Sequence, residues 1–156
     1  MRTLKLVLAT ALLVAPPVVA QNRPITVTGV RGLTFGTVFP GVRRVILKTD
    51  PSNSAQFDIT GVKNNQLLLT FTLPASMTGP AGATMPLSFG ASDAGYSQSQ
   101  SIGSQVTFDP RTSFIASTLN QQGRGSVFLG GTANPTTNQR AGSYTATITL
   151  TVAYYP

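Results

Sequence analysis

A threonine-rich stretch close to the C-terminus, YTATITLTVAY over residues 144–154, carries the strongest secondary-structure signal in the sequence. Threonines alternate there with a row of apolar and aromatic side chains. An apolar row backed by a threonine row is typical of a half-buried β-strand, because successive side chains of a strand point to opposite faces. The side chains of the apolar row are Tyr144, Ala146, Ile148, Leu150, Val152 and Tyr154.

This strand closes the sequence, so we expect its second edge to be paired either within the fold or by a strand from another molecule. In the second case Tyr144, Ile148, Leu150, Val152 and Tyr154 would form the acceptor strand at a subunit interface. Near the other end of the chain, a short segment alternates as a donor strand would. That segment would equally serve as the first strand of the domain itself. Its alternating residues are Ile25, Val27 and Gly29.

The rest of the chain also follows a period of two, with Gly, Pro, Asn and Ser between the apolar runs. This pattern predicts an all-β domain of about seven to nine short strands, arranged as a β-sandwich or a barrel. Residues 91–104 are rich in Ser, Gln and Gly and predict a long exposed loop or an irregular sheet edge, in which Tyr96 is a candidate ligand contact. The only helix candidate, a weak one, is residues 111–120.

The N-terminus has the order of a secretory signal peptide. Arg2 and Lys5 precede an apolar run, and Val18-Val19-Ala20 forms a cleavage site. We therefore expect a signal peptide at 1–20, a domain at 21–156 without a membrane-spanning segment, and export to the periplasm, the cell surface or the medium. The chain has no cysteine, so the domain must be stabilised by packing and strand pairing without disulfides.

The residue inventory argues against an enzyme. There is no His, Cys or Glu, which removes the commonest general base, the thiolate nucleophile and the favoured zinc ligands. Four Asp remain, widely spaced along the chain, so we expect no catalytic residues, no cofactor and no metal site. The net charge is +7, but the basic residues are scattered, unlike a nucleic-acid footprint. Their one small cluster, Arg43, Arg44 and Lys48, predicts a solvated strand face or, alternatively, a contact with an acidic surface.

Three segments, in this order, resemble the bacterial family named domain of unknown function 4402. They are Leu33–Val38 (LTFGTV), Ala55–Gly61 (AQFDITG), and Gly130-Gly131-Thr132 followed by Gly142-Ser143-Tyr144 and the closing strand. That family looks related to spore-coat U and archaic chaperone–usher pilin proteins. The resemblance implies an immunoglobulin-like antiparallel β-sandwich displayed at or beyond the outer membrane.

Chaperone–usher pilins lack a final strand and accept one from a neighbouring subunit. Gly142 and the apolar residues of the closing strand match the pilin spacing if Pro156 is treated as one extra residue. The resemblance therefore implies self-association or other pilin-like subunits as partners, with a periplasmic chaperone and an outer-membrane usher. Our leading hypothesis is a non-catalytic subunit of a cell-surface fibre (a pilus or fimbria). The alternative is a monomeric secreted or surface-bound binding module, an adhesin.

Overall fold

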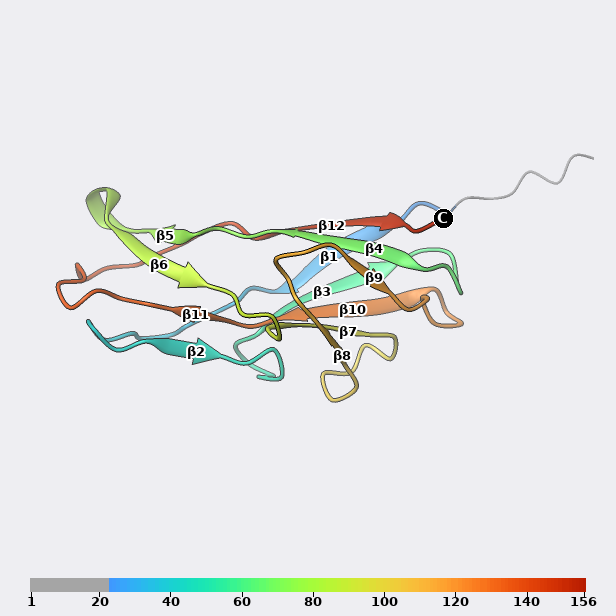
Figure 1. Cartoon of the computed structure of the whole chain (residues 1–156), viewed down its shortest axis with the longest axis horizontal. Coiled ribbons are helices and arrows are strands. Elements are labelled where there is room, and N and C mark those ends of the chain that lie inside the picture. The colour runs from blue at the N-terminus through green and yellow to red at the C-terminus, as the bar shows by residue number, and fades with distance from the viewer. Residues whose placement is uncertain (1–22) are drawn as a thin grey trace, which may run out of the picture.

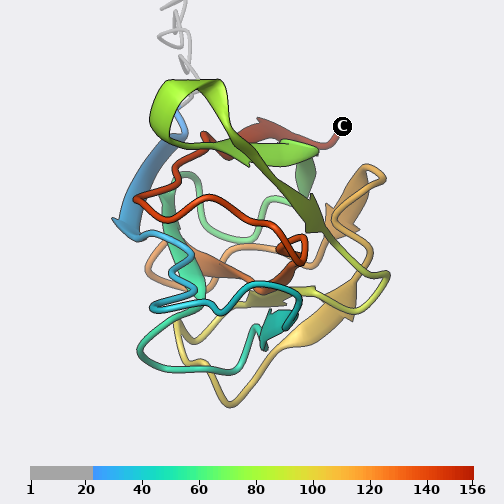
Figure 2. The ribbon, with the colours of Figure 1, turned by 90° about the vertical axis from the view of Figure 1, so that its left-hand side faces the viewer.

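The computed structural model describes residues 23–156, which fold almost entirely into β-strands (Figures 1 and 2). The predicted all-β class is confirmed, and the predicted signal peptide lies outside the described residues. The twelve strands exceed the expected seven to nine because several are only three residues long. They are β1 (Thr26–Arg31), β2 (Arg44–Ile46), β3 (Ala55–Thr60), β4 (Leu67–Thr72), β5 (Ser76–Thr78), β6 (Thr84–Ser88), β7 (Ala94–Ser97), β8 (Val106–Phe108), β9 (Phe114–Ala116), β10 (Arg124–Leu129), β11 (Gly131–Ala133) and β12 (Thr149–Tyr154), with one 3₁₀ turn, η1 (Pro80–Gly82).

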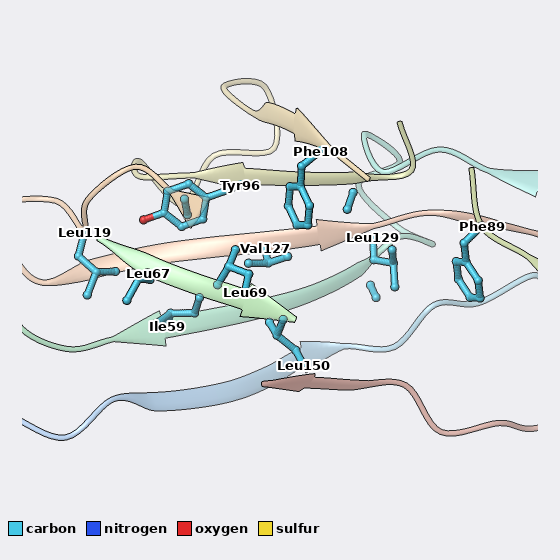
Figure 3. Packing of buried hydrophobic residues seen from close by; sticks show 13 residues of the cluster. Ile59, Leu67, Leu69, Phe89, Tyr96, Phe108, Leu119, Val127, Leu129 and Leu150 are labelled. Carbon is cyan, nitrogen blue, oxygen red and sulfur yellow. The ribbon is translucent and has the colours of Figure 1, made fainter. Parts of the chain in front are cut away.

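Two antiparallel sheets pack face to face as a β-sandwich. One has the order β1-β3-β10-β7-β8 and the other the order β12-β4-β9. Their inward side chains form one core cluster, in which Ile59 and Val127 of the first sheet face Leu67 and Leu69 of the second (Figure 3). All four side chains are fully buried. Removal of this apolar surface from water is the main contribution to the stability of the fold, since the chain has no disulfide.

A third sheet, β2-β11-β6-β5, extends the sandwich at the end away from the C-terminus (Figure 1). Gly130 joins β10 to β11, and the backbones come so close there that a Cβ at this position would lie 2.3 Å from the carbonyl oxygen of Ile46. Only glycine allows that approach. A second core cluster, which includes Phe35, Met77 and Met85, fills this end.

Two sequence-based expectations are wrong. Residues 91–104 are not one long exposed loop, because they include β7, whose four residues are all buried between β10 and β8. Residues 111–120 contain no helix and instead form β9, which pairs with β4 from Leu67↔Ala116 to Leu69↔Phe114. In both segments, pairing to an apolar neighbour strand outweighs a polar local composition, as strand propensity depends strongly on context.

Both sheets of the sandwich end in an edge strand at the same side of the molecule. In the first sheet β1 pairs only with β3, and in the second β12 pairs only with β4. β1 and β12 lie next to each other in Figure 3, each with one edge that no strand of residues 23–156 occupies. Within the same residues, no helix has the length and apolar character needed to cross a membrane.

Candidate strand-binding groove

The closing strand alternates as the sequence predicts. Leu150 is buried, Ile148 and Val152 are half-buried, and the threonines from Thr145 to Thr151 are exposed. The paired strand is shorter than the alternating stretch, because β12 begins only at Thr149. Its partner β4 ends at Thr72, and Pro74 follows, which has no N–H to donate to a ladder. Residues 144–148 therefore belong to no strand, and their one bridge to another strand is Thr78↔Thr145.

An open groove separates this C-terminal segment from the chain around β1. A cavity of about 310 Å³ lies between Gly29–Leu33 on one side and Ala146 and Ile148 on the other, with Ala55 and Phe57 completing it. A larger cavity of about 640 Å³ continues it, and Leu33 lines both. The larger one is lined by Leu33–Val38, Pro40, Met77, Met85 and Gln139–Tyr144. The two cavities lie in succession along residues 139–148, and we refer to them together as the groove.

Nonpolar side chains line much of the larger cavity. Phe35, Met77 and Met85 are each less than 10% exposed, and no Asp lines either cavity. Methionine side chains are flexible and polarizable, so they adapt to different apolar partners. A largely apolar groove beside the edge strand β1 and the segment before β12 provides the two contacts that an incoming strand needs, namely backbone hydrogen-bonding groups and room for alternate side chains.

Tyr144 fixes one wall of the larger cavity. Its hydroxyl donates to the carbonyl oxygen of Arg140 at 2.7 Å and accepts from Nε2 of Gln139 at 2.7 Å. Its ring lies against Gly79, where a Cβ would come within 2.5 Å of the ring. A larger residue than glycine at position 79 would therefore push the Tyr144 ring out of this wall.

The five predicted acceptor residues divide into two groups. Tyr144 and Ile148 line the groove, and Ile148 packs against the main core as well, whereas Leu150, Val152 and Tyr154 lie in or against that core without lining the groove. The Tyr154 hydroxyl accepts from the Val62 amide and donates to the Arg23 carbonyl, both at 2.8 Å. Tyr154 therefore ties the last strand to its own domain and does not line the groove.

The predicted donor residues lie in or beside the domain's own first strand. β1 is paired with β3 from Thr26↔Thr60 to Arg31↔Gln56, with an irregularity between Gly29 and Arg31. Ile25 packs against the core, Val27 is opposite Ile59, and Gly29 lines the smaller cavity. In this structure the segment is therefore the first strand of its own domain, one of the two roles that the sequence left open, the other being a donor strand. Donation of these residues to a neighbour would require β1 to leave β3, and it stays a prediction.

The expected exposure of Tyr96 is wrong. Its side chain is 1% exposed and lies in the core between the sheets (Figure 3). Burial raises its pKa to about 12, and its hydroxyl donates to the Thr118 carbonyl at 3.3 Å. Tyr96 is thus a core residue with one internal polar partner, and it offers no surface to a ligand.

The groove residues that sequence reasoning missed come from three separate segments. Leu33 and Phe35 alternate within the LTFGTV motif, which was a usable signal for an inward-facing strand-like segment. Met77 and Met85 meet only because β5 and β6 form a hairpin in which they are directly opposed. No local pattern relates these two methionines to the C-terminal segment on the far wall of the groove.

The four Asp side chains all accept hydrogen bonds from nearby groups. Asp50 accepts from the Ser52 and Asn53 amides at 2.9 Å, which together with the Asn53 side chain lowers its pKa. The Arg111 side chain lowers the pKa of Asp109 to about 2. Both residues precede proline and serve turns, as the sequence predicts. Asp58 accepts from the Ser126 hydroxyl and Asp93 from the Gly90 amide. Within residues 23–156, no three ligand-type residues gather in one place.

Comparison with known protein families gives one match. The model of the family described as domain of unknown function 4402 (DUF4402) covers residues 41–154. The match confirms the family that the sequence resembles, and it does not extend to spore-coat U or pilin proteins. A search of curated proteins finds no matching relative.

Proposed function

The chain belongs to the DUF4402 family, and we propose that it is a non-catalytic subunit of a bacterial cell-surface fibre, assembled by β-strand complementation. The observation that carries the proposal is the groove along residues 139–148, which Gly29–Arg31 of the edge strand β1 border and which leads along the chain to β12, a second strand with an unpaired edge. On this proposal the chain is exported through the periplasm to the cell surface or beyond.

An incoming strand would gain stability in two ways. Its backbone would satisfy the free edge of β12 and of the segment before it, and its alternate side chains would enter the cavities beside Ile148 and Tyr144. At about 3.3 Å per residue, a strand of roughly nine residues would match the length from Tyr144 to Val152. Burial of apolar surface contributes about 25 cal/mol per Å², so side chains that enter the cavities would add to the stability given by the backbone hydrogen bonds.

The partner strand would come from another subunit or from a second copy of this chain. A second copy would supply β1 only after breaking its own pairing with β3, in the manner of a domain swap. A periplasmic chaperone that covers the groove before assembly, and an outer-membrane usher, would fit the same mechanism. An uncovered apolar groove with free strand edges promotes aggregation.

A charge placed in the groove tests the mechanism. Ala146 is exposed and lines the smaller cavity, so Ala146→Lys puts a cation where a partner strand would lie without disturbing the core. The matched control is Thr147→Lys, one residue further along on the opposite, exposed face of the strand. We expect the wild-type protein and Thr147→Lys to form fibres in negative-stain micrographs and a heat-labile ladder on unheated gels, and Ala146→Lys to form neither.

Two results would overturn the proposal. Fibres that assemble equally well in the Ala146→Lys variant would show that the groove is not the assembly site. A wild-type protein that stays a monodisperse monomer would leave the monomeric binding module as the better description. Thermal melting of both variants establishes that each one is folded.

A further inference from the structure

A second surface, separate from strand exchange, combines exposed apolar side chains with positive charge. Of the large hydrophobic side chains that are exposed in the described residues, four lie within the segment Phe39–Lys48. They are Phe39 at 66%, Val42 at 59%, Val45 at 47% and Leu47 at 62% exposed. The segment lies at the end of the molecule opposite the C-terminus (Figure 1). Contiguous exposed apolar surface of this kind marks interaction sites in soluble domains.

The local structure holds these side chains outward. Phe39 and Val42 flank a tight Pro-Gly turn, closed by the Val42 amide donating to the Phe39 carbonyl at 3.1 Å. Gly41 has a φ of +72°, which favours glycine, and its amide donates to Thr136 at 3.0 Å. The turn is therefore tied to the body of the domain. In β2 the alternation buries Ile46 and exposes Val45, and Leu47, directly after the strand, is exposed as well.

The charge of the same segment is entirely positive. Arg43, Arg44 and Lys48 lie in it, and no Asp does. The only salt bridge within residues 23–156 joins Arg111 to Asp109, so neither Arg43 nor Arg44 is paired with a carboxylate there. A second copy of this chain is a poor electrostatic match for this surface, because its four Asp side chains already accept local hydrogen bonds. The complementary partner is therefore an anionic surface of another kind.

We propose that the Phe39–Lys48 surface attaches the domain to an anionic lipid bilayer. Phosphate headgroups would pair with the arginines, while the exposed apolar side chains of the same segment would enter the boundary between headgroups and acyl chains. The observations favour lipid over a glycan, because a hydrophilic glycan gains nothing from exposed apolar side chains such as Leu47 and Val42, whereas the headgroup boundary of a bilayer accommodates apolar and cationic side chains together.

Co-sedimentation with vesicles tests this attachment. The full chain is mixed with vesicles of phosphatidylglycerol and phosphatidylcholine in equal parts, and with vesicles of phosphatidylcholine alone, at low and at high salt. We expect binding to the anionic vesicles at low salt, with a loss of at least tenfold in the partition coefficient for Arg43→Gln/Arg44→Gln and for Phe39→Ser/Leu47→Ser. Each cation near an anionic surface contributes roughly fivefold to such binding.

Matched controls remove equivalent groups elsewhere on the surface. Lys63→Gln/Arg124→Gln removes two exposed cations, and Val106→Ser/Ile115→Ser removes two exposed apolar side chains. Both controls should bind within about twofold of the wild type. All variants keep the same N-terminus, so any contribution from that part of the chain cancels.

Three outcomes would overturn the proposal. The first is equal binding to both vesicle types. The second is an equal loss of vesicle binding in the controls and in the Phe39–Lys48 variants. The third is binding to soluble polyglutamate that persists in Phe39→Ser/Leu47→Ser. The last outcome would assign the surface to an acidic macromolecule. Because these variants leave Ala146 and the groove intact, the vesicle result is independent of whether fibres form.

Discussion

At the scale of single residues, the environment of a side chain outweighs its local sequence. Tyr96 lies in a Ser- and Gly-rich segment that suggests a surface loop, yet it is one of the largest fully buried side chains. Gly125, on the neighbouring strand, leaves the space that the Tyr96 ring occupies, because a Cβ at position 125 would lie 2.6 Å from the Tyr96 hydroxyl oxygen. The absence of one side chain thus makes room for another, which no reading of residues 91–104 alone could detect.

Substitutions of Tyr96 should separate its ring from its hydroxyl. Tyr96→Ala leaves a large cavity and should lower the free energy of unfolding by about 3–5 kcal/mol. Tyr96→Phe removes only a long hydrogen bond and should cost less than about 1.5 kcal/mol at pH 7. Denaturant unfolding monitored by circular dichroism measures both. A larger loss in the phenylalanine variant than in the alanine variant would contradict this assignment of roles.

The same residue predicts a dependence on alkaline pH. Burial raises the pKa of Tyr96 from its ordinary value of 10 to about 12. Stability should be unaffected by this group below pH 10 and should fall as the pH rises toward 12, because the unfolded chain loses the phenolic proton first. The Tyr96→Phe variant should show a shallower decline over this interval than the wild type. Parallel curves for the two proteins would mean that Tyr96 ionises normally in the folded state.

At the scale of the element, β12 has two different faces and two different edges. Leu150 is buried opposite Phe71, whereas the neighbouring Thr151 is exposed opposite Thr70. One edge is fully paired with β4, and the other is open within the described residues. β12 therefore has backbone hydrogen bonds on one edge only, and we expect its inward side chains to contribute more to its stability than its outward ones.

This asymmetry predicts the cost of truncating each face. Leu150→Ala should lower the free energy of unfolding by about 2–4 kcal/mol, because it removes core contacts and leaves a cavity. Thr151→Ala should change it by less than about 1 kcal/mol, since its side chain faces solvent. Thermal or denaturant melts of the two variants give the comparison. Similar losses in both would indicate that the outward face is also covered in solution.

At the scale of the whole molecule, backbone pairing is complete at the centre of the first sheet and incomplete at the open side of the sandwich, where β1 and β12 each have one unpaired edge. β10 is paired on both edges, with β3 and β7, and five of its six residues are buried. Along the open side, residues 144–148 have a single backbone bridge. Local stability should therefore decrease from the central strands of the first sheet toward the groove, as expected where backbone groups are exposed and poorly paired.

Hydrogen exchange should reveal this gradient. Amides of β10 should exchange slowest, through global unfolding, and those of residues 144–148 should exchange fastest among the extended segments. If a strand fills the groove, assembled material should protect residues 144–148 and leave the protection of β10 unchanged. Mass-spectrometric exchange on free and assembled protein measures both. Fast exchange of residues 144–148 in the assembled form would argue against a strand in the groove.

Local sequence is sufficient for the class of fold and for the orientation of the closing strand. The alternation from Tyr144 to Tyr154 specifies a half-buried strand because side chains in a strand point to opposite faces. The membership of the DUF4402 family and the turn roles of Asp50 and Asp109 could also be predicted from the sequence. The groove could not be predicted from the sequence, because its walls come from segments around positions 33, 77, 85 and 146 that are distant in sequence. Only long-range strand pairing brings these segments together. The same pairing makes β1 and β12 the edge strands of two facing sheets, each with one edge unpaired.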